Sequence, residues 1–143
     1  MAHSRRLIRR APMSWEYIAC FFDCEGSVRV STRSRSPHPR LDMSQRNLQV
    51  LEEMKAFMGY GNIRPNGPNS NGVMRLHIEG KRNILHFTRH AEPYLRVKRR
   101  QVVWARLMAE RINAGPRRTS EKTRREREFL ASKIKEANSG HRV

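Results

Sequence analysis

The helical spacing of the apolar residues indicates a buried helix near the start of the chain. Residues 15–26 read WEYIACFFDCEG, and on a helical wheel they carry two neighbouring apolar stripes. The first stripe consists of Trp15, Ile18, Ala19 and Phe22, and the second of Tyr17, Cys20, Phe21 and Cys24. A helix that is apolar nearly all round is buried on more than one side, and this helix is too short to span a bilayer. We therefore expect one stripe to pack on its own domain and the other on a partner.

After Gly26 the apolar residues recur at every second position, which predicts strands. Val28 and Val30 lie in the first strand, Leu41 and Met43 lie in the second, and a proline-containing turn separates them. This pattern is typical of a hairpin with one apolar and one polar face. The polar face would carry Ser27, Arg29, Ser31, Arg33, Arg35, His38, Arg40, Asp42 and Ser44.

A second helix and a second hairpin are predicted to follow. The helix covers residues 47–58 and ends at the glycine-containing segment 59–61. Its expected buried row is Leu48, Leu51, Met54 and Phe57. A turn-rich loop over residues 65–72 separates the third and fourth strands. The polar positions of these strands are Asn62, Arg64, Arg75 and His77.

Three helical segments complete the predicted order. They are a short helix over 81–90, a helix that starts at Pro93 and runs to about residue 113, and a highly charged helix that starts at Ser120. The expected apolar contacts are Ile84, Leu85 and Phe87 in the first and Phe129, Leu130 and Ile134 in the last. The order is one αββαββ unit followed by C-terminal helices, which indicates an α+β fold.

The charge of the chain favours nucleic acid as its partner. Its 143 residues include 30 Lys and Arg against 13 Asp and Glu, a formal net charge of +17. A membrane surface is disfavoured, because no segment approaches spanning length and no basic amphipathic anchor stands out. The polar hairpin faces fit the major groove of double-stranded DNA, where Arg would read guanine or contact phosphate and Asp42 would accept from a cytosine amine. The alternative is an ordinary solvent-exposed sheet face.

Glu25 is the strongest candidate for a chemical role. It stands at the C-terminal end of the first helix, where the helix dipole disfavours a carboxylate. Gly26 is expected to end that helix in the left-handed conformation. A divalent cation would compensate the carboxylate, and oxygen ligands with few Cys or His favour Mg²⁺ over zinc. The alternative is a carboxylate that simply faces solvent.

Residues 18–26, IACFFDCEG, resemble the nine-residue LAGLIDADG motif of homing endonucleases. The resemblance implies an αββαββα fold with a four-stranded, antiparallel, saddle-shaped DNA-binding sheet and C-terminal helices. It also implies that the acidic eighth motif position, here Glu25, binds the catalytic metal. Cys20 and Cys24 replace the usual Gly or Ala at the third and seventh positions, so we expect the paired helices to cross slightly farther apart.

The resemblance further implies a dimer and two additional catalytic residues. A single motif is typical of the homodimeric members, and the interface would be formed by Tyr17, Cys20, Phe21 and Cys24. Gln45 matches a position that holds water near the scissile phosphate, and Lys98 matches a basic position of the outer active-site pocket. Taken without the family, Gln45 is a strand-end polar residue and Lys98 one more solvated lysine. Asp23 is expected to cap or pair rather than to catalyse.

The function implied by the resemblance is site-specific DNA cleavage. The protein would be a homing endonuclease that makes a Mg²⁺-dependent double-strand break with 3′ overhangs at a long, near-palindromic site. The alternatives are a DNA-binding protein of the same fold that no longer cuts, and a maturase, for which RNA would be the partner.

Composition also suggests an organisation and a source. We expect a basic flexible arm over residues 1–12, the endonuclease domain over 13–113, and a basic C-terminal helix and tail over 114–143. The preference for Arg over Lys favours a bacterial or phage source and a cytoplasmic location, with an organelle as the alternative. Two cysteines on one helix do not make a disulfide framework, which fits a reducing compartment.

Overall fold

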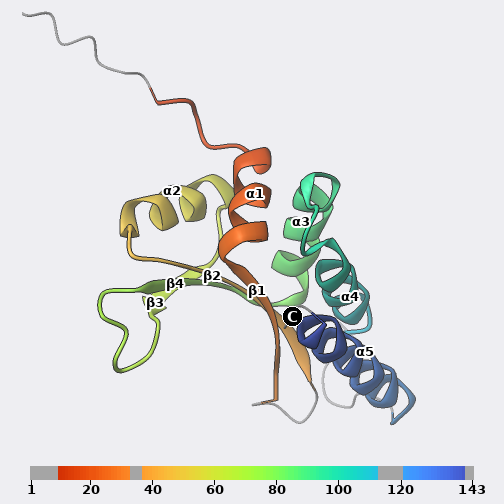
Figure 1. Ribbon diagram of the computed structural model, residues 1–143. Helices are drawn as coiled ribbons and strands as arrows, with labels where there is room; N and C mark the ends of the chain where they lie inside the picture. Colours follow the sequence, from red (N-terminus) through yellow and green to blue (C-terminus); the bar gives the residue numbers. More distant parts are fainter. Residues whose placement is uncertain (1–9, 33–36, 113–120, 141–143) are drawn as a thin grey trace, which may run out of the picture.

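The computed structural model describes residues 10–32, 37–112 and 121–140 (Figure 1). The order is helix α1 (Trp15–Glu25), strands β1 (Gly26–Ser31) and β2 (His38–Gln45), helix α2 (Leu48–Met58), strands β3 (Asn62–Pro65) and β4 (Met74–Ile78), and helix α3 (Lys81–Ala91). The 3₁₀ turn η1 (Glu92–Tyr94) and helices α4 (Arg99–Glu110) and α5 (Glu121–Ser139) follow. The α+β fold and the αββαββα order with C-terminal helices are confirmed.

The four strands form one antiparallel sheet in the order β1-β2-β4-β3. The two hairpins join through β2 and β4, where Asp42 is the register partner of His77. In the view of Figure 1, helices α1 to α4 lie above the sheet and the lower side of the sheet is open. The sheet therefore has a covered face that carries the core and an open face.

The apolar rows predicted for the strands point into the core. Val28, Leu41, Met43 and Leu76 are buried beneath the helices. From above, Phe22 of α1 packs against Phe87 of α3, with ring centroids 5.4 Å apart. The alternation of the strands thus places their polar residues on the open face.

Helix α1 forms for reasons that are visible in its sequence. The Ser14 hydroxyl accepts a hydrogen bond from the Tyr17 backbone N–H at 3.2 Å, and the capped helix then buries one stripe. Ile18, Ala19 and Phe22 are fully buried, which confirms the prediction for the first stripe.

Gly26 ends α1, but the predicted left-handed conformation is wrong. Its φ of −83° and ψ of 160° are those of a strand, and it is the first residue of β1. Glycine is required here for space, because a Cβ atom would lie 2.5 Å from the Phe22 carbonyl oxygen and against the Phe22 ring. The chain can therefore turn from helix to strand directly over a core aromatic residue.

The buried row of α2 differs from the prediction. Leu51, Met54 and Met58 are buried, whereas Leu48 and Phe57 are exposed. A helix has 3.6 residues per turn, so each step of three residues stops about 60° short of a full turn. The three steps from Leu48 to Phe57 therefore place these two residues about 180° apart around the helix axis. As predicted, the helix ends at Gly59, which has a left-handed φ of 83°.

The C-terminal helices also differ from the prediction in detail. Residues 95–98 are not helical, and α4 begins at Arg99 rather than at Pro93. In α5, Leu130 and Ile134 are buried as expected, together with Ala131, whereas Phe129 is 57% exposed. Helix α5 shares the core with α4, so the part of the C-terminal region that the structure describes packs on the domain.

Two side chains tie α5 to the first hairpin. The Asn138 amide donates to the Val28 carbonyl at 2.9 Å, and the Arg127 guanidinium donates to the Pro37 carbonyl at 3.1 Å. Most of the arm predicted over residues 1–12 lies outside the described residues. The domain boundaries drawn from composition stay a prediction.

Candidate nucleic-acid interface and metal site

The open face of the sheet gathers the polar side chains of both hairpins, because residues opposite each other in antiparallel strands share a face. Rows across the sheet are Ser27–Asp42–His77–Asn62, Ser44–Arg75–Arg64, Arg29–Arg40 and Ser31–His38. Arg33 and Arg35, which we also predicted to bind DNA, lie outside the described residues. The remaining predicted DNA-binding residues are brought together on one surface.

A hollow of about 490 Å³ opens in this face. It is lined by Ser31, His38, Arg40, Asn62, Arg64, Pro65, Arg75, His77 and Glu79. Burial lowers the pKa of Arg75, and the positive charges of Arg29 and Arg40 lower it further, while Asp42 acts in the opposite direction. A polyanion bound at the hollow would relieve this repulsion.

Asp42 lies beneath the basic side chains of this face. Its side chain is 1% exposed, and ion pairs link it to Arg29, Arg40 and His77. The role that we predicted, acceptance from a cytosine amine, needs a carboxylate that DNA can reach. In this structure three basic side chains enclose it instead.

Glu25 and Lys98 come together where α1 meets the sheet. Glu25 is the exposed last residue of α1, and the Lys98 ammonium donates to the Phe22 carbonyl at 3.3 Å. Burial is the largest influence on Lys98 and lowers its pKa, whereas the negative charges of Asp23 and Glu25 work in the opposite direction. Lys98 is thus a partly buried cation held beside acidic groups.

Asp23 holds the segment that carries Lys98. Its carboxylate accepts hydrogen bonds from the backbone N–H groups of Arg96, Val97 and Lys98 at 2.8, 3.2 and 3.0 Å. Asp23 thus pairs with backbone groups, as expected for a residue that caps or pairs. This clamp also explains why α4 starts late, because it fixes residues 96–98 in a non-helical conformation.

Gln45 is the last residue of β2, and its side chain is half-buried. Its amide oxygen accepts from the Arg46 backbone N–H at 2.8 Å. Since Gly26 pairs with Met43, Gln45 and Glu25 lie at the same end of the β1–β2 pair. Within the described ranges, no group of three or more His, Cys, Asp or Glu side chains converges to hold a metal ion.

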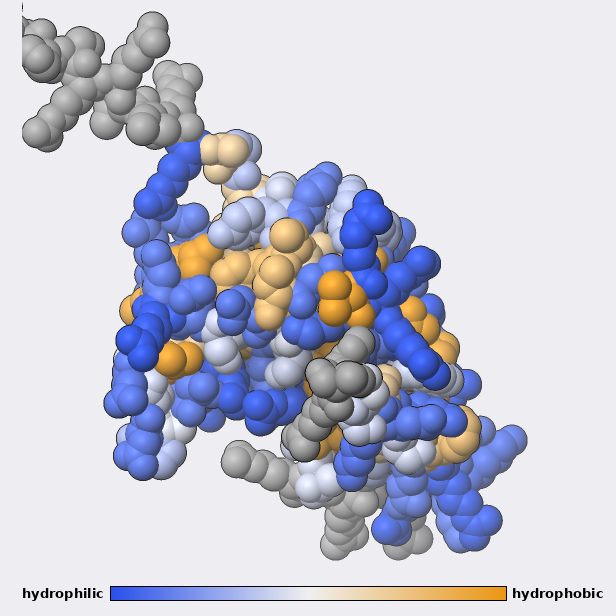
Figure 2. All heavy atoms as spheres, in the orientation of Figure 1, coloured by the Kyte–Doolittle hydropathy of each residue, from blue (hydrophilic) through white to orange (hydrophobic). Residues whose placement is uncertain are grey.

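The second stripe of α1 lies on the surface. Tyr17 is 49% exposed, Cys20 and Cys24 are also exposed, and Phe21 is half-buried. Figure 2 shows apolar side chains gathered over α1 and hydrophilic ones around them. Tyr17, Cys20, Phe21 and Cys24, which we call the α1 stripe, are the residues predicted for a dimer interface.

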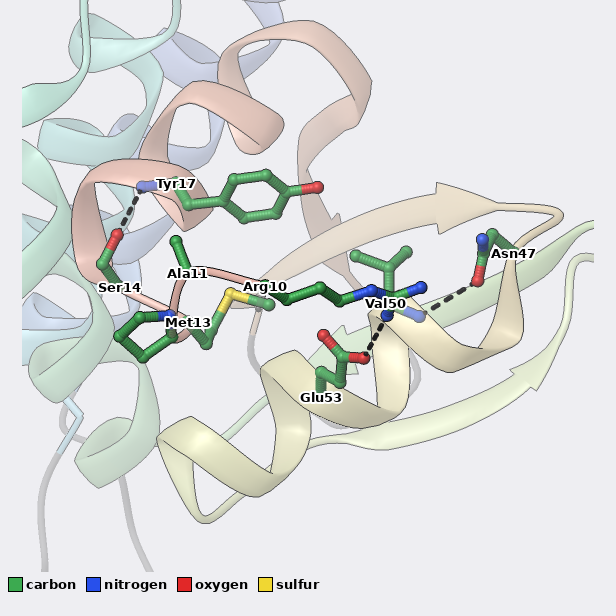
Figure 3. A pocket seen from close by; sticks show the side chains of 9 residues that line it. Arg10, Ala11, Met13, Ser14, Tyr17, Asn47, Val50 and Glu53 are labelled. Carbon is green, nitrogen blue, oxygen red and sulfur yellow. Dashed lines mark hydrogen bonds and ion pairs between the residues drawn. The ribbon is translucent and has the colours of Figure 1, made fainter. Parts of the chain in front are cut away.

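A cavity of about 480 Å³ lies at the Tyr17 end of the α1 stripe, between α1, α2 and the segment before α1 (Figure 3). Met13, Tyr17 and Val50 contribute to its wall, and the ion pair between Arg10 and Glu53, at 3.1 Å, closes one side. The surface beside the stripe is therefore indented as well as apolar.

Two further features of the structure were not predicted from sequence. One is the enclosure of Asp42, for which the only sequence signal is an acid within a row of basic residues. The other is an aromatic cluster in which Trp15 stacks on His90 with centroids 5.1 Å apart, and the Tyr60 hydroxyl lies 2.8 Å from Nδ1 of His86. Both depend on contacts between residues far apart in sequence.

Neither a protein-family model nor a curated protein sequence matches the chain. Solved structures are nevertheless similar to it. The homing endonuclease I-CvuI, in complex with its target in the presence of calcium, has a TM-score of 0.74 at 20% identity, over 90% of this chain and 83% of that chain. For the archaeal intron-encoded homing endonuclease I-Vdi141I complexed with DNA, the TM-score is 0.60 at 19% identity, over 88% and 97%.

A longer protein is similar to this chain over part of its length. The LAGLIDADG meganuclease I-AabMI, bound to uncleaved DNA, has a TM-score of 0.67 at 16% identity, over 83% of this chain and 44% of that chain. The chain thus matches most of I-CvuI and I-Vdi141I but less than half of I-AabMI. As for a membrane, no helix among the described residues has the length and apolar character needed to cross one.

Proposed function

We propose that this chain, whose fold is that of the LAGLIDADG homing endonucleases, is a site-specific DNA endonuclease. It makes a double-strand break with 3′ overhangs at a long, near-palindromic site. One observation carries the proposal: the exposed Glu25 and the partly buried Lys98 meet where α1 enters a sheet whose open face is lined with Arg and His. A surface suited to binding a polyanion thus adjoins one acidic residue, Glu25, and one basic residue, Lys98.

The open face binds double-stranded DNA in this proposal. A two-stranded ribbon fits the major groove, and Arg, His and Asn side chains supply donors and acceptors for base edges and phosphates. The net charge of +17 adds attraction that does not depend on sequence. Affinity should therefore fall with salt, by about 0.9 log units per neutralised phosphate for each decade of concentration.

Mg²⁺ fits the ligands that the chain offers. The described residues provide one exposed carboxylate at the site, Glu25, and no cluster of Cys or His around it. Mg²⁺ is commonly held by one or two carboxylates together with substrate phosphates and water. When bound, it supplies Lewis-acid activation of water and stabilises the leaving oxygen.

Three residues of the chain are assigned roles in cleavage. Glu25 offers carboxylate oxygens to the metal. Lys98, held by Asp23 through the backbone, stabilises negative charge on the phosphate. Gln45, at the same end of the sheet, orients water with its amide.

A homodimer completes the site, because one chain supplies only one Glu25. The exposed α1 stripe supports this assembly, since contiguous apolar surface on a highly charged protein marks an interaction site. Pairing of two α1 helices along the stripe would bring two Glu25 residues to one axis. A two-fold protein dimer also matches a near-palindromic site.

The test is cleavage of a randomised library of DNA duplexes with Mg²⁺, using the wild type and Glu25→Gln. We expect the wild type to cut a defined subset of duplexes. Glu25→Gln should reduce cleavage by about a hundredfold to a thousandfold, as expected for loss of electrostatic stabilisation of a transition state, while the same duplexes still bind. Glu52→Gln, which removes an exposed carboxylate from α2, is the matched control and should cut normally.

The alternative functions give different results. If the wild type binds one duplex tightly and never nicks it, the nuclease proposal fails and the chain is a DNA-binding protein of this fold. If it selects a structured RNA and no duplex, it acts as a maturase. In either case Glu25→Gln would leave the activity of the protein unchanged.

A further inference from the structure

We infer that Asp42 is a positioning residue for sequence recognition, whose buried carboxylate fixes Arg29, Arg40 and His77 so that their other polar groups face the bases. The inference rests on the proposed function, because it requires the open face of the sheet to bind DNA. It changes the role of Asp42 from a side chain that contacts a base to one that orders the side chains that do.

The sheet register places Asp42 at the centre of the basic surface. Asp42 lies between Ser27 of β1 and His77 of β4 in a row that crosses all four strands. Arg40 is two positions before it on β2, on the same face, and Arg29 is the register partner of Arg40. A carboxylate at this position is within reach of basic side chains from three strands.

The contacts use selected atoms of each basic group. Nε of Arg29 lies 3.2 Å from Oδ2 of Asp42, and Nε of Arg40 lies 3.3 Å from Oδ1. Arginine carries five N–H groups, so an ion pair through Nε leaves the terminal NH₂ groups for other partners, and in Arg40 one of them, Nη1, also lies 3.6 Å from Oε1 of Glu79. Those terminal groups form the bidentate fork that recognises guanine or phosphate.

The contact with His77 fixes which nitrogen of its ring carries hydrogen. Nδ1 of His77 lies 2.5 Å from Oδ1 of Asp42. A carboxylate only accepts hydrogen bonds, so Nδ1 carries a hydrogen, and the opposite ring nitrogen, Nε2, is left for another partner. Nε2 is thus a polar group held in place for a base edge in the major groove.

Asp42 also counters repulsion among the basic residues. The positive charges of Arg29 and Arg40 both act on Arg75 in this hollow. Without the buried carboxylate, the basic side chains on neighbouring strands would repel one another and move apart, and each side chain would sample more conformations. A side chain that is already fixed loses less conformational entropy when DNA binds. The fixed arrangement therefore favours recognition of particular bases.

The hydrogen bonding around the buried Asp42 carboxylate is incomplete. Among the described residues, Nε of Arg40 and Oδ2 of Asp42 are buried atoms without a partner in good hydrogen-bond geometry, although both are within ion-pair distance of opposite charge. A simple structural role for Asp42 would favour full hydrogen bonding. Buried polar atoms without partners are costly, so a purely structural role does not account for this arrangement.

The test compares Asp42→Asn with the wild type in two measurements. The first is the base preference at each position of duplexes selected by binding from a randomised library, and the second is affinity for unselected duplex DNA. Removal of a negative charge should tighten binding to unselected DNA. Loss of positioning should reduce discrimination between preferred and mismatched duplexes by about tenfold or more, within the range for a lost bidentate contact.

The matched control is Glu52→Gln. Glu52 is an exposed residue of α2 and does not line the hollow. This substitution also removes one negative charge, so it should tighten binding to all duplexes and preserve the base preferences. The pair of variants separates positioning from a purely electrostatic effect.

A second variant covers the case in which Asp42→Asn does not fold. Arg29→Lys keeps the charge at a half-exposed site but removes the Nε anchor and the fork, so it should fold. We expect it to lose preference at a subset of the base positions that Asp42→Asn affects.

The outcomes distinguish this inference from the proposed function. If the wild type selects no motif from the library, site-specific recognition itself fails. If the wild type selects a motif and both variants retain its base preferences at full strength, the DNA-binding function stands and the role of Asp42 as a positioning residue is refuted.

Discussion

At the scale of single residues, tight packing explains why Gly26 is a glycine, and hydrogen bonding explains why Asp23 is an acid. Gly26 allows the backbone to pass over the Phe22 ring, and Asp23 binds three backbone N–H groups of a distant segment. Both residues adjoin Glu25. The local sequence around the proposed metal ligand is therefore constrained on each side by packing.

Gly26→Ala should destabilise the protein by about 1–3 kcal/mol, as expected when a methyl group is forced into a packed core. The added Cβ would meet the Phe22 carbonyl oxygen at 2.5 Å, and neither the backbone nor the buried ring can easily move. Urea unfolding measures the change. Gly140→Ala is the control, because its Cβ would meet nothing closer than 3.8 Å. Equal stability of the two variants would contradict this account of Gly26.

At the scale of elements, α1 is joined to α3 by rings from both helices. Trp15 stacks on His90, the rings of His86 and His90 lie 4.5 Å apart, and Tyr60 bonds to His86. Burial lowers the pKa of His86 below its usual 6.5, and the positive charges of His90, Arg89 and Arg82 lower it further. This junction is therefore sensitive to acid.

Acidification from about pH 7.5 to about pH 5.5 should lower the stability of the wild type more than that of His86→Gln. The unfolded chain takes up the proton near pH 6.5, whereas the folded chain takes it up only at lower pH, so stability is lost as pH falls through this interval. Gln keeps a polar partner for Tyr60 but does not titrate. Urea midpoints at the two pH values measure the effect, and parallel losses in both proteins would rule out a contribution from His86.

The elements were predicted well where local pattern decides them. Both stripes of α1 and the faces of the hairpins follow from periodicities of 3.6 and 2. The start of α4 was not predicted, because Asp23 fixes it from more than 70 residues away. The enclosure of Asp42 depends on the register of three strands, which the pattern of one strand cannot supply.

At the scale of the whole molecule, two surfaces with different chemistry meet at Glu25. The open face of the sheet is basic and polar, whereas the α1 stripe is apolar and exposed. A chain with a net charge of +17 should resist pairing with its twin in the absence of DNA, because like charges repel. We therefore expect DNA to favour assembly of the dimer.

Cys20→Arg should prevent dimer formation without unfolding the chain. Cys20 is exposed in the described structure, so the larger side chain meets solvent in the single chain, but in a symmetric pair it would place two positive charges in one apolar interface. Sedimentation with duplex DNA should detect one chain where the wild type shows two. Normal pairing of this variant would exclude Cys20 from the interface.

The most direct test of the account is the mass of the complex between the wild-type protein and a duplex that it selects, measured by native mass spectrometry. Two α1 stripes that pair to bring two Glu25 residues together require two chains on each duplex, and that is the predicted mass. A single chain on a duplex that is nonetheless cut on both strands would contradict the account.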